Sequence, residues 1–68
     1  MLDRKWINQQ AAVVYVYWEN RISPDESLQK KCIERVMEMI RHYREGEDPE
    51  QYRDIITQQV QSIIAMNS

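Results

Sequence analysis

The sequence predicts an all-α fold: a small three-helix up-down-up bundle that forms a single helical domain over residues 1–68. Apolar residues recur at the three-then-four spacing of a helix in two long segments. Two short phrases, Ser23-Pro24-Asp25-Glu26 and Asp48-Pro49-Glu50-Gln51, place an N-cap residue, a proline and a capping-box acceptor in the order that starts a helix. We therefore expect a helical hairpin over 24–45 and 49–66, and an N-terminal helix over about 3–20.

The N-terminal segment has the weakest signal, because the run from Ala12 to Trp18 is rich in β-branched and aromatic residues, which also favour strands. Helical periodicity decides between the two. Val13 and Tyr17 share one helical face, and Val14 and Trp18 share the adjoining one. A single strand would have no partner in this otherwise helical chain unless it paired with another copy. We expect a helix that either completes the bundle or forms an arm beside the hairpin, and a swapped strand over 12–18 stays the alternative.

The helix expected over 24–45 presents one apolar stripe, and Gly46 follows as the residue type best suited to the left-handed turn after a helix. The members of the stripe are Leu28, Cys32, Ile33, Val36, Met39, Ile40 and Tyr43. The same period returns after Pro49 at Tyr52, Ile55, Ile56, Val60, Ile63 and Ile64. Because the connection over 46–48 is too short for anything but a tight turn, the two helices should be antiparallel.

A chain of 68 residues buries only about 60% of its unfolded surface, so a core of this size needs reinforcement. Cys32 has no second cysteine to pair with, and with His42 it provides too few ligands for a structural zinc site. We therefore expect the reinforcement to come from a protein partner or from a homo-oligomer, with a dimer favoured. The unpaired cysteine and the lack of an apolar signal segment at Met1 predict a cytoplasmic location.

The charge balance gives no sign of an electrostatic partner. The formal net charge is −2, from 9 basic and 11 acidic residues, so we expect neither nucleic acid nor a membrane surface as a partner. The longest apolar run, Ala11 to Trp18, is far shorter than the ~20 residues of a membrane span. The alternative of a small DNA-binding regulator would use basic side chains of the helix expected over 24–45 against phosphates, although Glu34 and Glu38 interrupt that face. These basic residues are Lys30, Lys31, Arg35, Arg41 and Arg44.

No constellation of residues indicates catalysis. The sequence has no glycine-rich phosphate loop and no cluster with metal-ligand spacing, and helix capping accounts for the paired carboxylates Asp25 and Glu26. Cys32 and His42 are ten residues apart, nearly three helical turns, so they cannot act as a nucleophile and its base on one helix. We therefore expect no catalytic, cofactor-binding or metal-binding residues, and a function other than that of an enzyme.

The apolar run in the N-terminal helix is larger than one buried stripe requires, which predicts a protein-binding surface. Tryptophan and tyrosine carry a large share of the binding energy at interfaces, and the candidate contact residues in this helix are Trp6, Val14, Tyr15 and Trp18. The competing interpretation is that the three-helix core covers these side chains. The expected function is that of a small adaptor, chaperone or inhibitor, of bacterial or phage origin from its size.

The segment from Glu34 to Ile64 resembles the helical hairpin of small type III secretion needle co-chaperones. It has a helix ending in Arg44-Glu45-Gly46, then Asp48-Pro49-Glu50-Gln51-Tyr52 and a helix rich in glutamine and isoleucine, and it covers under half of the chain. Those proteins are short hairpins that hold a needle subunit together with a second chaperone. The resemblance implies that Tyr52, Ile56 and Val60 lie on a binding face, and Tyr52 and Ile56 join the candidate contact residues on that basis. The aromatic segment before Ser23 departs from the family pattern, so a needle co-chaperone stays an alternative function.

Overall fold

The computed structural model describes residues 2–67 and contains three α-helices. These are α1 (Arg4–Trp18), α2 (Leu28–Tyr43) and α3 (Arg53–Met66), and a short 3₁₀ helix, η1 (Pro49–Tyr52), leads directly into α3. No strand occurs among the described residues, and 12–18 are helical throughout. The predicted all-α fold is therefore confirmed, and the alternative of a swapped strand in this segment is wrong.

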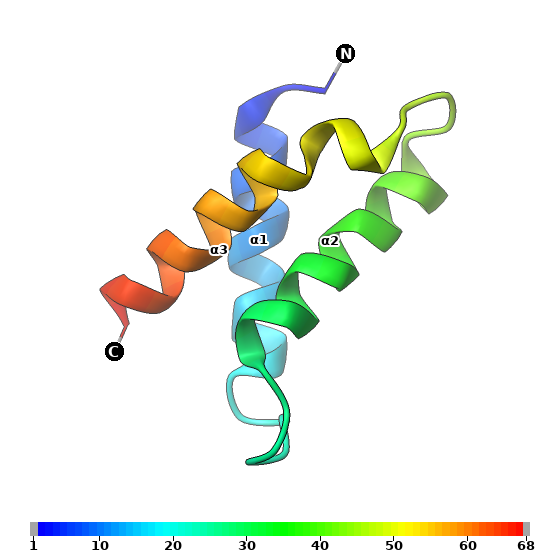
Figure 1. The fold of residues 1–68 in the computed structure, drawn as a ribbon. Helices are drawn as coiled ribbons and strands as arrows, with labels where there is room; N and C mark the ends of the chain where they lie inside the picture. The colour runs from blue at the N-terminus through cyan, green and yellow to red at the C-terminus, as the bar shows by residue number, and fades with distance from the viewer. Residues whose placement is uncertain (1, 68) are drawn as a thin grey trace.

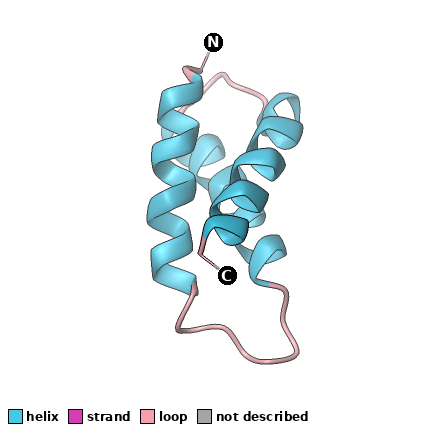
Figure 2. Cartoon of the chain, turned by 90° about the vertical axis from the view of Figure 1, so that its left-hand side faces the viewer, coloured by secondary structure: helices cyan, strands magenta, loops and turns pink. Residues whose placement is uncertain are grey.

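The helices follow the predicted up-down-up order. In Figure 1 the chain descends through α1, returns upwards through α2 and descends again through α3. Each helix packs against the other two. The connection between α1 and α2 forms a long loop at one end of the bundle, drawn in pink in Figure 2. The N-terminal helix is therefore a full member of the bundle and not a separate arm.

The start of α2 differs from the prediction. The helix begins at Leu28, where the Oγ atom of Ser27 accepts a hydrogen bond from the backbone N–H of Lys30 at 3.2 Å. Ser23 and Glu26 close a turn of their own: the Ser23 N–H donates to Oε1 of Glu26, and the Glu26 N–H donates to the Ser23 carbonyl, both at 3.0 Å. The predicted start at residue 24 is wrong because a second capping serine, Ser27, directly precedes Leu28, the first residue of α2 and one that packs against the core.

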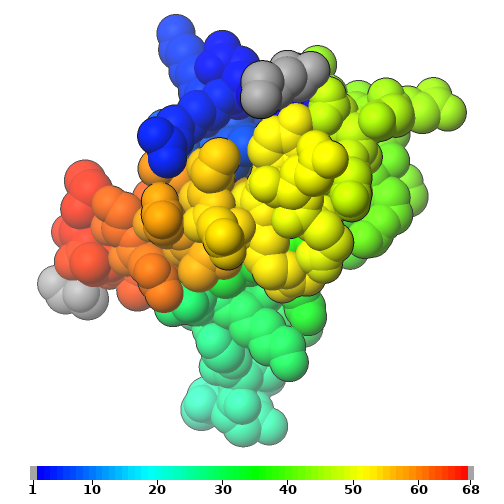
Figure 3. Space-filling view, turned by 45° about the horizontal axis from the view of Figure 1, so that its top comes forward, coloured from blue at the N-terminus to red at the C-terminus, as the bar shows by residue number. Residues whose placement is uncertain are grey.

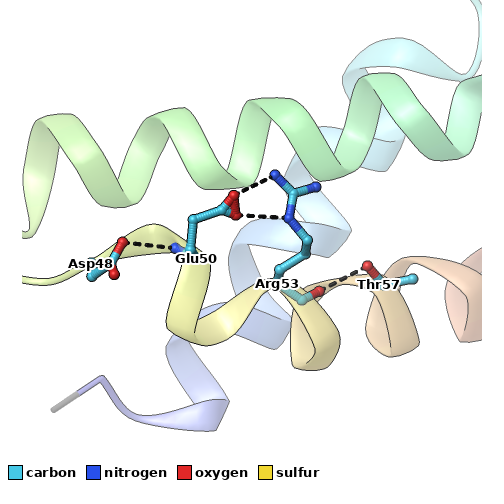
Figure 4. Close-up of polar contacts among 4 residues, drawn as sticks. All are labelled: Asp48, Glu50, Arg53 and Thr57. Atoms are coloured by element: carbon cyan, nitrogen blue, oxygen red, sulfur yellow. Dashed lines mark hydrogen bonds and ion pairs between the residues drawn. The ribbon is translucent and has the colours of Figure 1, made fainter.

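The start predicted after Asp48 is confirmed. Oδ1 of Asp48 accepts from the Glu50 N–H at 3.1 Å (Figure 4). Pro49 occupies the first helical position. The guanidinium of Arg53 donates two hydrogen bonds to the carboxylate of Glu50, both at 2.8 Å, where η1 passes into α3 (Figure 4). The Thr57 hydroxyl donates to the Arg53 carbonyl at 2.8 Å in the next turn.

Helix ends elsewhere lie within two residues of the prediction. Asp3 caps α1 by accepting from the Lys5 N–H at 3.0 Å, and the helix stops at Trp18. α2 stops at Tyr43, and Gly46 takes the left-handed conformation expected of it, with φ at 95°. The short turn from α2 into η1 is therefore built with the residue that such a backbone favours.

The core lies between the three helices and receives residues from every element. Its buried members are Ile7, Ala11 and Val14 of α1, Cys32, Ile33, Val36, Met37 and Ile40 of α2, Tyr52 of η1, and Ile56 and Val60 of α3. Tyr43, expected on the buried stripe of α2, is exposed because it is the last residue of that helix. Figure 3 shows the N-terminal segment, in blue, against η1 and the start of α3, in yellow. The Leu2 N–H donates to the Tyr52 hydroxyl there at 3.1 Å.

Candidate protein-binding surface

One face of α1 is uncharged, largely apolar and exposed. Gln9, Ala12, Val13, Val16 and Tyr17 are all exposed, and their spacing of three and four residues places them on a single helical stripe, here called the outer stripe. Val13, Val16 and Tyr17 keep 61%, 63% and 52% of their surface accessible. The buried residues Ile7, Ala11 and Val14 form a separate stripe. α1 therefore carries two uncharged stripes that are largely apolar, of which the bundle covers one.

A groove adjoins the outer stripe between α1 and α2. This outer groove encloses about 480 Å³, and its lining residues are Val13, Val14, Tyr17 and Trp18 of α1 with Arg35, Glu38 and Met39 of α2. Its walls are mainly apolar. Arg35 and Glu38 supply a polar rim, in which Nη1 of Arg35 lies 3.3 Å from Oε1 of Glu38. The stripe and the groove together make one continuous surface, because Val13 and Tyr17 belong to both.

Two aromatic rings at the C-terminal end of α1 are held in place by each other and by cations. The Tyr17 and Trp18 rings meet edge to face, with centroids 5.0 Å apart and an interplanar angle of 87°. The Arg21 guanidinium lies 4.5 Å from the Tyr17 ring centroid and donates to the Tyr17 carbonyl at 2.7 Å. Nζ of Lys31 lies 5.2 Å from the Trp18 ring centroid. Rings that are already ordered lose little conformational entropy when a partner covers them.

The predicted contact residues of α1 do not form one surface. Val14 is buried, whereas Trp6, Tyr15 and Trp18 are half-buried and pack against the core. Trp6 and Tyr15 are nine residues apart, a rotation of about 900°, which places them on opposite sides of the helix. Trp6 lies beneath the Arg44 guanidinium, 4.9 Å from its ring centroid. Of the four, Val14 and Trp18 line the outer groove.

The binding face implied by the needle co-chaperone resemblance lies inside this fold. Tyr52, Ile56 and Val60 are all buried in the core. The Tyr52 hydroxyl, besides accepting from Leu2, donates to Oε2 of Glu47 at 2.6 Å. In this chain these three side chains pack inside the bundle, in a core that also contains residues of α1, and so they are not accessible to a partner.

The contact residues predicted from the sequence do not include the three large apolar side chains that α1 leaves exposed: Val13, Val16 and Tyr17. Periodicity places Val13 and Tyr17 on one helical face, but it does not say which face the bundle covers. One signal was available, since α1 has no charged residue between Lys5 and Glu19. A surface helix normally shows charge opposite its buried stripe, so an uncharged helix indicates contacts on more than one side.

Two of the basic residues suggested for phosphate contacts, Lys31 and Arg35, have acidic partners within the fold. Nζ of Lys31 lies 2.9 Å from Oε2 of Glu26 besides covering Trp18, and this hydrogen bond raises the pKa of Lys31 and lowers that of Glu26. Arg35 pairs with Glu38. Lys30 is exposed, and its side chain makes no ion pair or hydrogen bond among residues 2–67.

Groups with catalytic or metal-binding chemistry do not gather at this surface. Cys32 is fully buried, and burial raises the pKa of its thiol, which leaves it protonated and unreactive. Within residues 2–67 no group of three or more His, Cys, Asp or Glu side chains could hold a metal ion. Over the same residues, no helix has the length and apolar character needed to cross a bilayer.

Comparison of the chain with protein-family models, curated proteins and solved structures yields no match.

Proposed function

We propose that this chain is a non-catalytic protein-binding module whose contact surface is the outer stripe together with the outer groove. The observation that carries the proposal is the exposure of Val13, Val16 and Tyr17 on an uncharged, regularly spaced helical face. Helix faces with this spacing are normally buried against another element. Contiguous apolar surface on a soluble domain is typical of an interaction site.

The aromatic end of the surface supports the same proposal. Tyrosine and tryptophan are enriched at interface centres, and Tyr17 and Trp18 lie side by side at the groove. The contact centre proposed here differs from the sequence-based one, because Tyr15 lies on the other side of α1. An adaptor, a chaperone and an inhibitor would each use such a surface, and the proposal covers these three roles.

A reducing compartment such as the cytoplasm suits this proposal. Cys32 is a free thiol that fills space in the core and has no second cysteine with which to pair. Its burial supports a packing role and gives no reason to place the chain in an oxidising compartment.

Site-specific photocrosslinking tests the proposed surface. A photoreactive phenylalanine derivative replaces Val16 on the outer stripe, and a matched protein carries it at Gln58, which is exposed on α3. Irradiation in the producing cells should yield protein adducts from position 16 and only background from position 58. Equal background at both positions would refute a binding role for the outer stripe.

A further inference from the structure

We infer that the occupant of the outer stripe is the outer stripe of a second copy, packed as an antiparallel helix pair about a two-fold axis at Ala12. This inference rests on the proposed function and names the partner of that surface. The evidence is the position of two charged residues at the ends of the stripe.

Lys5 and Glu19 are placed symmetrically about Ala12. Each is seven residues from it, which is close to two full turns, so both lie on the same side of α1 as Ala12. Both are exposed, and neither takes part in an ion pair among residues 2–67. The uncharged stripe between them spans about 20 Å.

This charge pattern is complementary to itself in one orientation. When two copies of α1 pack antiparallel about Ala12, Lys5 of each copy lies opposite Glu19 of the other, which makes two attractive pairs. A parallel pair would place Lys5 against Lys5 and Glu19 against Glu19. Like charges opposite each other disfavour association, so the pattern selects the antiparallel arrangement.

The helix dipole favours the same arrangement. α1 has no acidic residue in its first turn and no basic residue in its last turn, so Lys5 and Glu19 each stand at the end of the helix that disfavours their charge. In an antiparallel pair, Lys5 approaches the negative C-terminal end of the second α1 and Glu19 approaches its positive N-terminal end. Association therefore offsets the unfavourable interaction of Lys5 and Glu19 with the dipole of their own helix.

The shape of the stripe suits a close helix pair. Val13 and Val16 lie in the middle of the stripe, and the small Ala12, midway along its length and at its edge, leaves room there for side chains of the second copy. The outer groove extends the contact on the side of Tyr17 and Met39. A single helix pair covers less than the roughly 800 Å² per partner of a standard interface, so we expect a weak, micromolar dimer.

Light scattering of the full chain from low micromolar to submillimolar concentration tests for the second copy, and charge reversal tests its orientation. Lys5→Glu or Glu19→Lys alone turns both attractive pairs into repulsive ones, which should weaken dimerisation about tenfold at low ionic strength. The double variant Lys5→Glu/Glu19→Lys restores both charge pairs, although each charge then faces the helix end of like sign, so it should dimerise more tightly than either single variant and less tightly than the original chain. Lys30→Glu, on exposed α2 surface, makes the same charge change as Lys5→Glu and should leave dimerisation unchanged.

These variants keep α1 folded, because each reversal gives the helix end the charge that its dipole favours. A chain that stays monomeric at every concentration overturns the inference. A dimer that is insensitive to the single reversals, or is no tighter in the double variant than in the single variants, overturns it as well.

The crosslinking experiment distinguishes a failure of the dimer hypothesis from a failure of the proposed protein-binding role. A monomer whose position 16 forms adducts with a different protein overturns the second copy and leaves the binding module standing. A monomer with no adducts of any kind overturns both.

Discussion

The Tyr52 hydroxyl donates a hydrogen bond to Oε2 of Glu47 at 2.6 Å and so links the first turn after α2 to the start of α3. The same hydroxyl accepts from the Leu2 N–H at 3.1 Å, fifty residues away in sequence. The phenol ring itself is buried in the core. One side chain therefore fastens the N-terminal segment and the α2–η1 connection to the bundle.

Removing the Tyr52 hydroxyl should destabilise the fold, because its hydrogen bonds with Leu2 and Glu47 are both lost. In Tyr52→Phe the ring still fills its place in the core, but the Leu2 N–H and the Glu47 carboxylate lose their shared partner. We expect the melting temperature to fall by a few degrees in thermal denaturation followed by circular dichroism. Tyr43→Phe removes a hydroxyl from an exposed ring and should leave the melting temperature unchanged. Equal melting temperatures for Tyr52→Phe and the unaltered chain would contradict this role.

Stability should decrease in acid, in part through Glu47. The hydrogen bond from Tyr52 lowers the pKa of the Glu47 carboxyl in the folded chain, and hydrogen bonds from Lys31 and Arg53 lower those of Glu26 and Glu50. A carboxyl whose pKa is lower in the folded than in the unfolded state stabilises the fold above its unfolded pKa. That contribution is lost as the pH falls through the folded pKa.

We therefore expect the urea midpoint to fall progressively below about pH 5, where the carboxyls begin to bind protons in the unfolded state. Glu47→Gln cannot titrate and should show a shallower fall over the same range, measured by urea denaturation at several pH values. Glu45→Gln, an exposed neighbour, serves as the control and should follow the unaltered chain. A Glu47→Gln protein with an equally steep fall would show that this carboxyl does not contribute.

The two serines before α2 make distinct predictions. The Ser27 hydroxyl caps the helix through the Lys30 N–H, so Ser27→Ala should destabilise the chain by about 1 kcal/mol. Ser23 lies in the preceding turn, which is closed by its backbone groups, and Ser23→Ala should cost well under half as much. Urea denaturation measures both. The reverse order would place the functional cap at the start predicted from sequence.

This pair of serines shows what local sequence signals can and cannot decide. Ser23 and Ser27 both have cap chemistry, and the phrase around Ser23 matches the capping box better. The choice between them depends on where apolar residues first meet the core, which is a tertiary property. At Asp48 the next core residue, Tyr52, lies within one turn, so local and tertiary signals agree and the predicted start is confirmed.

The same limit applies to the candidate site. Periodicity correctly predicted a helix through Ala12–Trp18, but α1 has two apolar stripes, and the sequence cannot say which one the hairpin covers. Val14 and Tyr17 were equal candidates for burial by that criterion. The orientation of α1 on α2 and α3 decided between them, and it moved the candidate surface from Tyr15 to Val13, Val16 and Tyr17.

The neighbours Val13 and Val14 provide the sharpest check on that assignment, because the same truncation should destabilise the fold at Val14 and have little effect at Val13. Val14 retains 4% of its surface, so Val14→Ala deletes buried methyl groups and should cost about 2 kcal/mol in urea denaturation. Val13 retains 61%, so Val13→Ala should change stability by less than about 0.5 kcal/mol at a concentration where the chain is monomeric. The helix propensity of alanine exceeds that of valine, which favours both variants slightly and equally. A large loss for Val13→Ala with little for Val14→Ala would mean that α1 is rotated in the bundle, and that the outer stripe is core.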